Sequence, residues 1–455
     1  MDTEAAGTSP IRIDFTIPAS PIAVILAVGL LVRLLAAALP GFAVDLGTFE
    51  SWSVQLAEHG PWDFYTPEPF PDWAPGYLYV LWFIGGLDSV FDFNGDQFWY
   101  VLKTPSIAAD LASAYLLYRI LEGQKDGVRL GAAALYLLHP VVLLVGPVWG
   151  QVDSMLAFFL LLTVYYLARE RTLMAAVVFT VGFLVKPQAV AALPVFVFWG
   201  LRDEVRQVLP TLPDAADGLS RAIAFGRGLA ARVWPVAVAS LAAAFLMVIP
   251  FFPSNPLGIF DQLKDATELY PYNSFYAYNF WSLDFWGLTQ WLTKDNLTFL
   301  GLAYRSWGII LFAAASLSII WTFRDARGPG LLALATALSV LAFYLFMTRM
   351  HERYLFASLL LLLTAAAALK ARPLWAVFGV LSLVQFFNVY YAYIKFTSLP
   401  FEAEDNYLRV GWLFSWAEDQ VSLFSLLAFL AFPILMVTGR FLAMREERAG
   451  EGGKG

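Results

Sequence analysis

The sequence predicts an all-α polytopic membrane protein, because of its composition and its hydropathy pattern. Of the 455 residues, 59% are hydrophobic and only 14% are charged, whereas a soluble domain carries roughly 25% charged residues. Apolar runs of about 17–25 residues, the length that crosses a bilayer, recur along nearly the whole chain. The chain has no cysteine and a net charge of −7, so thiol chemistry is excluded and no basic stripe is available to bind nucleic acid.

About 12–13 transmembrane helices are expected from these runs, together with an outer loop after the first helix. The N-terminal run follows an acidic segment without a cleavage site, so it is interpreted as a retained helix and not as a signal peptide. The expected helices cover residues 20–40, 76–92, 98–121, 128–147, 152–169, 172–186, 188–201, 233–252, 305–323, 330–348, 354–370, 373–393 and 419–440.

Lysine and arginine in the short loops set the orientation, because both are enriched on the cytoplasmic side. The basic segments are 119–129, 169–171, 202–232, 324–327, 370–372 and 440–448. With these inside, the outer segments are 41–75, 139–153, 252–304, 348–354 and 395–418. A single crossing between residues 76 and 121 breaks the alternation, which predicts a re-entrant helix there or one basic loop that violates the rule. Segment 203–232 alternates apolar and charged residues, a pattern typical of an interfacial helix.

Asp45 is the first candidate for chemistry. It lies at the outer end of the first expected helix and precedes the polar segment TFESWSVQLAEHG. A loop aspartate often only caps a helix or is solvated. Ionisable residues beside membrane helices are nevertheless costly and are functional candidates by default. A carboxylate here would reach a lipid-borne substrate while the following segment lies along the membrane interface.

Two further segments interrupt apolar sequence with proline, glycine and polar residues. In PDWAPGYLYVLW, residues 71–82, Pro75 begins a helix, and Asp72 either caps that helix or contacts a ligand. In YLLHPVVLLVGPVWGQVDSMLAFFLLL, residues 136–162, irregular backbone at membrane depth indicates a wet cavity. Gln151 and Asp153 in this segment either orient the break or contact a substrate.

Lys186 ends a short apolar helix in LVKPQAVAALP, where Pro187 forces a break before the next helix. This lysine either snorkels to the interface or binds an anionic head group.

The segment RMHERY, residues 349–354, brings two arginines, a histidine and a glutamate between two apolar helices. It lies on the side assigned as outer, where cations are unusual. Arg349, His351 and Arg353 would chelate a phosphate through charge-assisted hydrogen bonds, with Glu352 orienting one of them. The alternative is a structural ion-pair cluster.

The order and spacing of these motifs resemble the GT-C superfamily of integral-membrane glycosyltransferases. The nearest likeness is to prokaryotic relatives of the mannosyltransferases that build glycosylphosphatidylinositol anchors. It covers most of residues 20–370 and rests on HGPWDFYTPEPFPDWAPGYLYVLW, LKTPSIAADLASAYLLYRIL, HPVVLLVGPVWGQVDSMLAFFLLL, VGFLVKPQAVAALPV, YNFWSL and RMHERYLF.

The resemblance implies an inverting glycosyltransferase that uses a polyprenyl-phosphate-linked sugar. It would move a hexose, with mannose as the family-level expectation, to a lipid, glycan or protein acceptor at the extracytoplasmic face of the cell membrane. Asp45 matches the acidic residue of the first outer loop that acts as general base or positions the acceptor hydroxyl. Many members have a second acid beside the first. Here Leu46 follows, so Asp45 would act alone or with Glu50 or Asp153, and the need for a divalent cation stays open.

The chemistry fits this resemblance. An inverting displacement needs one carboxylate to take the acceptor proton and positive charge to stabilise the departing phosphate. Trp52, Tyr65, Trp73 and Trp149 are candidates for stacking on sugar faces, and YNFWSL adds a tyrosine and an asparagine. The predicted substrate-binding set is Asp72, Trp73, Gln151, Asp153, Lys186, Tyr278, Asn279, Arg349, His351, Glu352 and Arg353, with Lys186, His351 and Arg353 as the cationic clamp.

Residues 1–455 are expected to form a single transmembrane domain, with a catalytic module at 20–250 and C-terminal helices at 251–455. The main alternative is a secondary transporter or a flippase for lipid or lipid-linked sugar, since broken helices with buried charges also build transporter sites. A non-catalytic scaffold is a third class. The absence of an evident internal repeat and the long outer loops favour the transferase.

Overall fold

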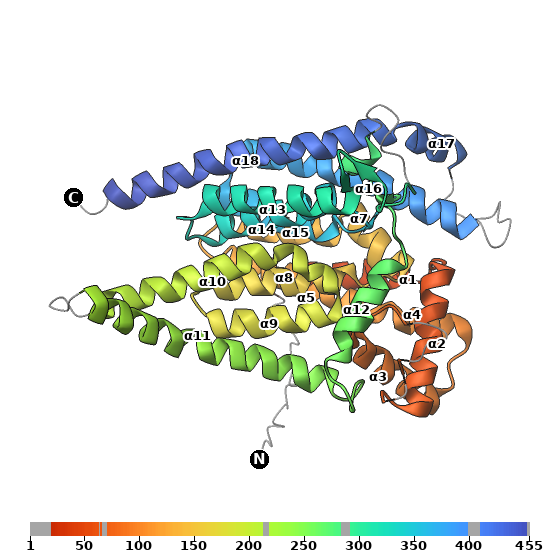
Figure 1. Cartoon of the computed structure of the whole chain (residues 1–455). Coiled ribbons are helices and arrows are strands. Elements are labelled where there is room, and N and C mark those ends of the chain that lie inside the picture. The colour runs from red at the N-terminus through yellow and green to blue at the C-terminus, as the bar shows by residue number, and fades with distance from the viewer. Residues whose placement is uncertain are drawn as a thin grey trace, which may run out of the picture.

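The computed structural model describes residues 20–62, 64–65, 71–212, 218–283, 292–398 and 410–452. It has the all-α architecture of a polytopic membrane protein that the sequence predicts (Figure 1). Long helices run side by side and form an elongated bundle, and shorter helices gather at one end of it. Parts of the two predicted outer loops, residues 66–70 and 284–291, lie outside the described residues.

The bundle helices largely follow the predicted apolar runs. The main difference is α11, which begins at Gly218, so residues 218–232 of the predicted interfacial segment are continuous with a long apolar helix, and residues 213–217 lie outside the described residues. The bundle consists of α1 (Pro21–Ala37), α5 (Thr104–Ile120), α6 (Asp126–Leu137), α7 (Pro140–Leu143), η1 (Leu144–Trp149), α8 (Asp153–Leu167), α9 (Thr172–Val185), η2 (Pro187–Ala192), α10 (Leu193–Val208), η3 (Leu209–Thr211), α11 (Gly218–Val248), α13 (Tyr304–Phe323), α14 (Pro329–Phe346), α15 (Phe356–Leu369), α16 (Arg372–Ser398) and α18 (Val421–Gly452).

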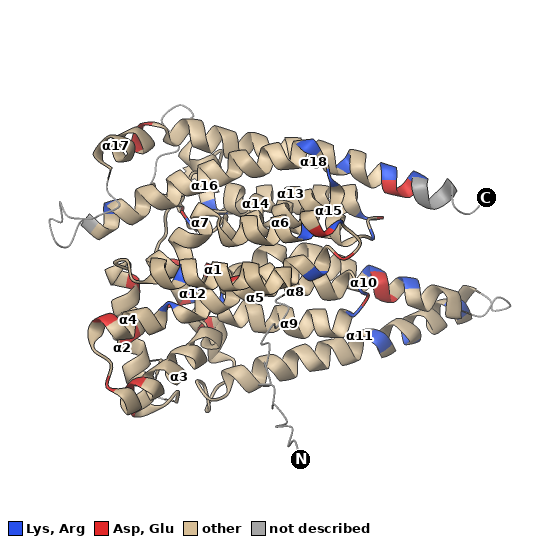
Figure 2. Ribbon diagram, turned by 180° about the vertical axis from the view of Figure 1, so that it is seen from behind, with Lys and Arg blue, Asp and Glu red and all other residues tan. Residues whose placement is uncertain are grey.

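The predicted basic loops lie together at one end of the bundle, which is here called the basic end (Figure 2). Arg169 forms an ion pair with Glu122 at 3.9 Å, and Gln124 donates a hydrogen bond to the carbonyl of Ala368. Arg202 likewise donates to the carbonyls of Arg324 and Ala326. Loops that are far apart in the sequence are therefore joined at this end, as the distribution of lysine and arginine predicts.

The opposite end carries α2 (Ala43–His59), α3 (Pro75–Phe91), α4 (Gly95–Leu102), α12 (Gly258–Glu268) and α17 (Gly411–Asp419) (Figure 1). α3 packs along α2, and a Cβ on Gly85 would lie only 2.0 Å from the carbonyl oxygen of Ser53. Tyr79 of α3 donates a hydrogen bond to the carbonyl of Met247, near the end of α11. α3 therefore stays at this end instead of running to the basic end, which removes the conflict in the predicted alternation between residues 76 and 121.

Length and composition divide the helices into two groups. Among the described residues, five helices are long and apolar enough to cross a membrane, or six if the bent pair Asp126–Leu137 and Pro140–Trp149 counts as one span. α1, α8, α9 and α15 are apolar but shorter. The predicted 12–13 spans therefore include several helices that are short or broken.

Two of the breaks fall where proline and glycine interrupt the sequence. α6 and the segment α7–η1 meet at an angle of 43°, and η1 is a π-helix that contains Pro147. π-helical turns of this kind are frequent at functional sites. The second break follows α9, where Lys186 is extended and Pro187 starts the 3₁₀-helix η2. Both breaks contribute residues to the site described below.

A short parallel pairing joins two segments that the sequence places far apart. β1 (Ser274–Phe275) pairs with β4 (Met350–His351), which ties the loop after α12 to the RMHERY segment. β2 (Thr298–Phe299) and β3 (Leu302–Ala303) form a separate antiparallel pair. The largest apolar core surrounds α8, α14 and α15, and a second core lies among α2, α3 and α4. The candidate site lies between these two cores.

Candidate active site

Asp45 lies in the first turn of α2, where the unpaired backbone N–H groups of a helix favour a carboxylate. Trp149 Nε1 donates a 2.7 Å hydrogen bond to Asp45 Oδ2, and Gln151 Nε2 donates to the same oxygen. The backbone N–H of Phe42 donates to the carbonyl of Trp149 at 3.0 Å. Within the described residues both side-chain donors share Oδ2, so Oδ1 is available to another donor such as a hydroxyl.

The turn at residues 149–153 gives these donors their direction. Gly150 has φ +95°, and a Cβ there would lie 2.6 Å from Leu46 Cδ2, so both the backbone conformation and the space call for glycine. Ser106 Oγ on α5 donates a 2.6 Å hydrogen bond to the carbonyl of Gln151. The predicted irregular segment is therefore an ordered turn that connects Asp45 of α2 to Asp153 of α8.

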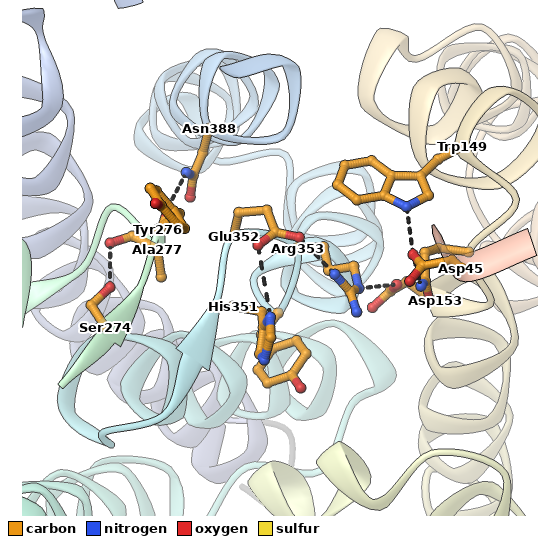
Figure 3. A network of polar contacts seen from close by, with 12 residues as sticks. Asp45, Trp149, Asp153, Ser274, Tyr276, Ala277, His351, Glu352, Arg353 and Asn388 are labelled. Atoms are coloured by element: carbon orange, nitrogen blue, oxygen red, sulfur yellow. Dashed lines mark hydrogen bonds and ion pairs between the residues drawn. The ribbon is translucent and has the colours of Figure 1, made fainter. Parts of the chain in front are cut away.

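Asp153 joins two cations from distant parts of the chain. Lys186 Nζ lies 2.7 Å from Asp153 Oδ1, and Arg353 Nε lies 3.6 Å from Oδ2. The side chains are 1%, 4% and 14% exposed for Asp153, Lys186 and Arg353, respectively. Figure 3 shows Arg353 between Asp153 and Glu352, with Asp45 and Trp149 beside it. The structure thus brings Asp45, Gln151, Asp153, Lys186 and Arg353 together.

Glu352 is the second partner of Arg353. Arg353 Nη1 donates a 2.6 Å hydrogen bond to Glu352 Oε1, and Gln385 Nε2 on α16 donates to the backbone carbonyl of Glu352 at 3.0 Å. Burial raises the pKa of the Glu352 carboxyl, while Arg353 acts in the opposite direction. The two cations of the cluster are therefore matched by two buried carboxylates, Asp153 and Glu352.

His351 lies at the edge of this cluster as a neutral group. Its ring packs against those of Tyr270, Phe275 and Tyr354, with centroids 4.9–5.1 Å apart. Burial, with a further contribution from Arg353 and Lys186, holds the pKa of His351 well below its usual value. The imidazole can therefore offer a hydrogen bond to a phosphate, but it does not add the positive charge that the sequence pattern predicts.

Asp72 and Trp73 approach the cluster from the segment before α3. Burial raises the pKa of Asp72, with Asp45 acting in the same direction and Arg353 opposing it, which indicates that Asp72 shares the electrostatic environment of the site. The Trp73 ring centroid lies 5.8 Å from Lys186 Nζ. Both residues are partly exposed, so they line the approach to the buried ions.

All of the aromatic candidates have protein contacts, and the Trp73 ring lies 5.2 Å from those of Phe49 and Tyr77. Trp149 stacks on Phe42 at 4.7 Å between centroids, and Tyr65 stacks on Phe252 at 4.6 Å. Trp52 is 5% exposed within the core of α2 and α3. Trp73 is the candidate that combines partial exposure with a position beside a cation of the cluster.

Arg349 is held away from the cluster by the end of α12 and the loop that follows it. Arg349 Nε lies 2.6 Å from Asp295 Oδ2, and Nη2 lies 3.1 Å from Glu268 Oε2. Its backbone has φ +65° and its N–H donates to the carbonyl of Tyr272. Arg349 therefore belongs to a structural ion-pair cluster, the alternative given for RMHERY, whereas Arg353 points to Asp153.

Tyr278 and Asn279 are buried within the protein. The hydroxyl of Tyr278 donates to the carbonyl of Ala417 at 3.1 Å, and the amide of Asn279 donates to the carbonyl of Tyr344 at 3.2 Å. Asn279 also accepts a hydrogen bond from the backbone of Trp281 at the start of η4 (Phe280–Ser282). The structure does not bring these two residues to Asp45.

Several residues that support the site were missed in the sequence. Gln188 Nε2 donates a 2.7 Å hydrogen bond to the hydroxyl of Tyr354, whose ring centroid lies 6.0 Å from Lys186 Nζ. Lys103 Nζ donates to the carbonyls of Ala37 and Leu39 and so fixes the end of α1 before Asp45. A lone lysine in the apolar run YVLKTPSI was a usable signal for Lys103.

The acidic residues around Asp45 do not converge on a preformed metal site. Across the part of the chain that the structure describes, no group of three or more His, Cys, Asp or Glu side chains is arranged to hold a metal ion. Glu50, which the sequence suggested as a partner of Asp45, accepts a 2.6 Å hydrogen bond from Trp99 of α4. Asp153 is the acid that lies on the same turn as Trp149 and Gln151, which donate hydrogen bonds to Asp45.

The site combines an oriented carboxylate with two buried cations. A guanidinium has five N–H donors and an ammonium has three, so Arg353 and Lys186 keep donors after pairing with Asp153 and Glu352. Asp45 is oriented by neutral donors, and no described residue forms a direct ion pair with it. The arrangement can take up a proton at Asp45 and stabilise negative charge beside Arg353 and Lys186.

Comparison with solved structures gives a likeness of low degree. No family model matches the chain, and no curated protein matches it. Among solved structures, the chain is similar to the archaeal oligosaccharyltransferase AglB from Archaeoglobus fulgidus, in complex with an inhibitory peptide and a dolichol-phosphate, with a TM-score of 0.36 and 12% identity. The match covers 92% of this chain and 56% of AglB, so the chain spans about half the length of that protein. A TM-score of this size does not establish a shared activity, and the function proposed below rests on the geometry of the site.

Proposed function

We propose that the protein is an inverting membrane glycosyltransferase in which Asp45 is the general base. The observation that carries this proposal is the position of Asp45. Trp149 and Gln151 orient its carboxylate, and the same turn leads to Asp153 and its ion pair with Lys186. A single displacement at an anomeric carbon needs a base on the acceptor side and cationic stabilisation on the leaving-group side. The site offers both within one group of buried and partly buried side chains.

The donor is a sugar linked to a polyprenyl phosphate. Arg353 and Lys186 bind the phosphate through donors that Asp153 and Glu352 leave unused, and His351 adds a neutral hydrogen bond. As the acceptor oxygen attacks the anomeric carbon, its proton passes to Asp45 and the bond between that carbon and the phosphate oxygen breaks. The phosphate leaves as an anion and needs no proton, so one carboxylate base is sufficient.

Three further predicted residues have supporting roles in this proposal. Asp72 and Trp73 lie at the approach to the cluster, where Trp73 offers an aromatic face to a sugar and Asp72 a hydrogen-bond partner to its hydroxyls. Gln151 orients the base. A hexose is the proposed sugar, with mannose as the first to test, and the acceptor is a lipid, a glycan or a protein.

The reaction is proposed for the extracytoplasmic side of the membrane. The basic loops lie at the end of the bundle opposite to α2, and basic loops are enriched on the cytoplasmic side. A donor whose polyprenyl chain remains in the bilayer would present its phosphate sideways to Arg353.

The test is a transfer assay with the full-length protein in detergent. Radiolabelled polyprenyl-phosphate mannose and polyprenyl-phosphate glucose are offered separately, with a lipid extract of the native host as acceptor source. We expect Asp45→Asn to lower the turnover about 100-fold or more, as expected for loss of a general base. Asp261→Asn is the matched control, because Asp261 is an exposed carboxylate of α12. Equal turnover by Asp45→Asn and wild type would overturn the assignment of the base, and consumption of neither donor would overturn the donor class.

A further inference from the structure

A cavity separate from the candidate active site lies beside α11. It has a volume of about 360 Å³ and lies between α8, α9, α10 and α11, within the roughly 300–1,000 Å³ range of ligand pockets. Its walls are almost wholly apolar side chains, such as Leu167, Phe179, Phe196, Val197 and Val236. Walls of this composition favour an apolar occupant.

α11 is the helix that such an occupant would hold in place. Of its 31 residues only Val248 is buried by the protein, and it runs along one edge of the bundle (Figure 1). Its contact with α10 includes a salt bridge between Arg232 Nε and Glu204 Oε2 at 2.7 Å. Glu204 is also part of the cavity wall. α11 is therefore joined to α10 by this salt bridge and to α3 by the hydrogen bond from Tyr79 to Met247, and its cavity-lining residues lie between these two attachments.

The basic end of the cavity carries polar groups suited to a lipid head group. Thr172, the first residue of α9, lines the cavity, is 9% exposed, and its hydroxyl has no hydrogen-bond partner within the described residues. Arg171 precedes it in the chain, and Arg232 precedes Val233 of the opposite wall. The unpaired hydroxyl of Thr172 thus lies in the cavity wall, and two exposed arginines adjoin lining residues in the chain, one of which, Arg232, is paired with Glu204.

We propose that this cavity binds one acyl chain of an anionic phospholipid from the cytoplasmic leaflet, with the phosphate at Arg171 and Arg232 and an ester carbonyl at Thr172. Arginine matches the geometry of phosphate oxygens, and anionic lipids are attracted to basic segments at the cytoplasmic surface. The bound lipid would pack between α11 and the bundle and so keep α11 aligned with it. This site is distinct from the candidate active site at the other end, and it does not depend on the proposed function.

Native mass spectrometry of the full-length protein tests the proposal. After washing in detergent, the protein is titrated with dioleoyl phosphatidylglycerol, dioleoyl phosphatidylcholine or a polyprenyl phosphate. We expect one tightly retained phosphatidylglycerol per chain. Val236→Trp, which fills the cavity, is expected to weaken retention about tenfold or more. Leu241→Trp is the matched control on the same helix, because Leu241 is 59% exposed and does not line the cavity.

The head-group contact is tested separately. Arg232→Gln is expected to remove the preference for phosphatidylglycerol over phosphatidylcholine, whereas Arg221→Gln, an exposed arginine nearer the start of α11, leaves it unchanged. Ala176→Phe is a second cavity-filling change, which keeps the test valid if Val236→Trp does not fold. Size-exclusion elution shows whether each variant is folded and monodisperse. Equal retention by wild type and both cavity-filling variants would overturn the proposal, as would preferential retention of polyprenyl phosphate.

Discussion

Lys186 Nζ lies 2.7 Å from Asp153 Oδ1, and the two side chains are 4% and 1% exposed. This pair joins the break after α9 to the first turn of α8, so it links both irregular segments of the site. A buried pair costs desolvation when it forms, and removal of one partner leaves an uncompensated charge. Variants of this pair can therefore show separately how it affects the stability of the protein and its transfer activity.

Lys186→Met is expected to lower the stability of the protein by several kcal/mol, on the order of 3–5 for loss of one buried partner. Arg353 at 3.6 Å from Asp153 Oδ2 should reduce the loss. The double variant Asp153→Asn/Lys186→Met should recover much of the stability but none of the transfer activity. Thermal unfolding in detergent measures the first effect and the radiolabel assay the second. A double variant as unstable as the single one would contradict this account.

Trp149→Phe should lower kcat more than it raises KM. The change removes the indole N–H that donates to Asp45 but keeps an aromatic ring to stack on Phe42. Loss of one of two orienting hydrogen bonds should lower kcat roughly 10-fold, about 1.4 kcal/mol. Trp52→Phe, a buried tryptophan of the same region, serves as the comparison and should leave kcat unchanged. The proposed role of Trp149 fails if both variants behave alike.

Gly85→Ala and Gly86→Ala should have opposite effects on stability. A Cβ on Gly85 would lie 2.0 Å from the carbonyl oxygen of Ser53, whereas nothing lies within 4 Å of a Cβ on Gly86. The first change should force α3 away from α2 and destabilise the protein by at least about 1–3 kcal/mol. The second should stabilise it by up to about 1 kcal/mol through helix propensity. Thermal unfolding of the two neighbours gives the comparison, and equal melting temperatures would refute the packing of α3 on α2.

The neutral state of His351 predicts a loss of stability in mild acid. Burial holds its pKa well below the usual value in the folded protein, while the unfolded chain takes up a proton near pH 6.5. As the pH falls below that value, the unfolded state alone gains the proton, so the contribution present above pH 6.5 is progressively lost. His351→Gln should lack this component. The difference in melting temperature between wild type and variant, followed from pH 8 to pH 5, should shrink as the pH falls, and a constant difference would contradict the assignment.

Much of the fold could be predicted because apolar runs report directly on helices. The position of α3 could not, since hydropathy identifies an apolar helix without saying whether lipid or α2 covers it, and the close contact of Gly85 with Ser53 decides the matter. In the site, Asp45, Gln151, Asp153, Lys186 and Arg353 were found from their chemical type beside apolar sequence.

Their partners were harder to find. The sequence groups Arg349 with Arg353, but Glu268 at the end of α12 and Asp295 in the loop that follows hold Arg349 apart. The local sequence pattern does not predict the hydrogen bond from Trp149 to Asp45, because it joins residues 104 positions apart. Contacts of this kind depend on how helices pack, which a single sequence does not display.

The parallel pairing of β1 with β4 makes one mechanical unit of two segments. Ser274 and Phe275 are in register with Met350 and His351, and Arg353 follows two residues later. A molecule that displaces the loop after α12 would pull on the backbone that carries this arginine. Entry of an acceptor beneath that loop would then shift Arg353 and so change the affinity of the site for a phosphate.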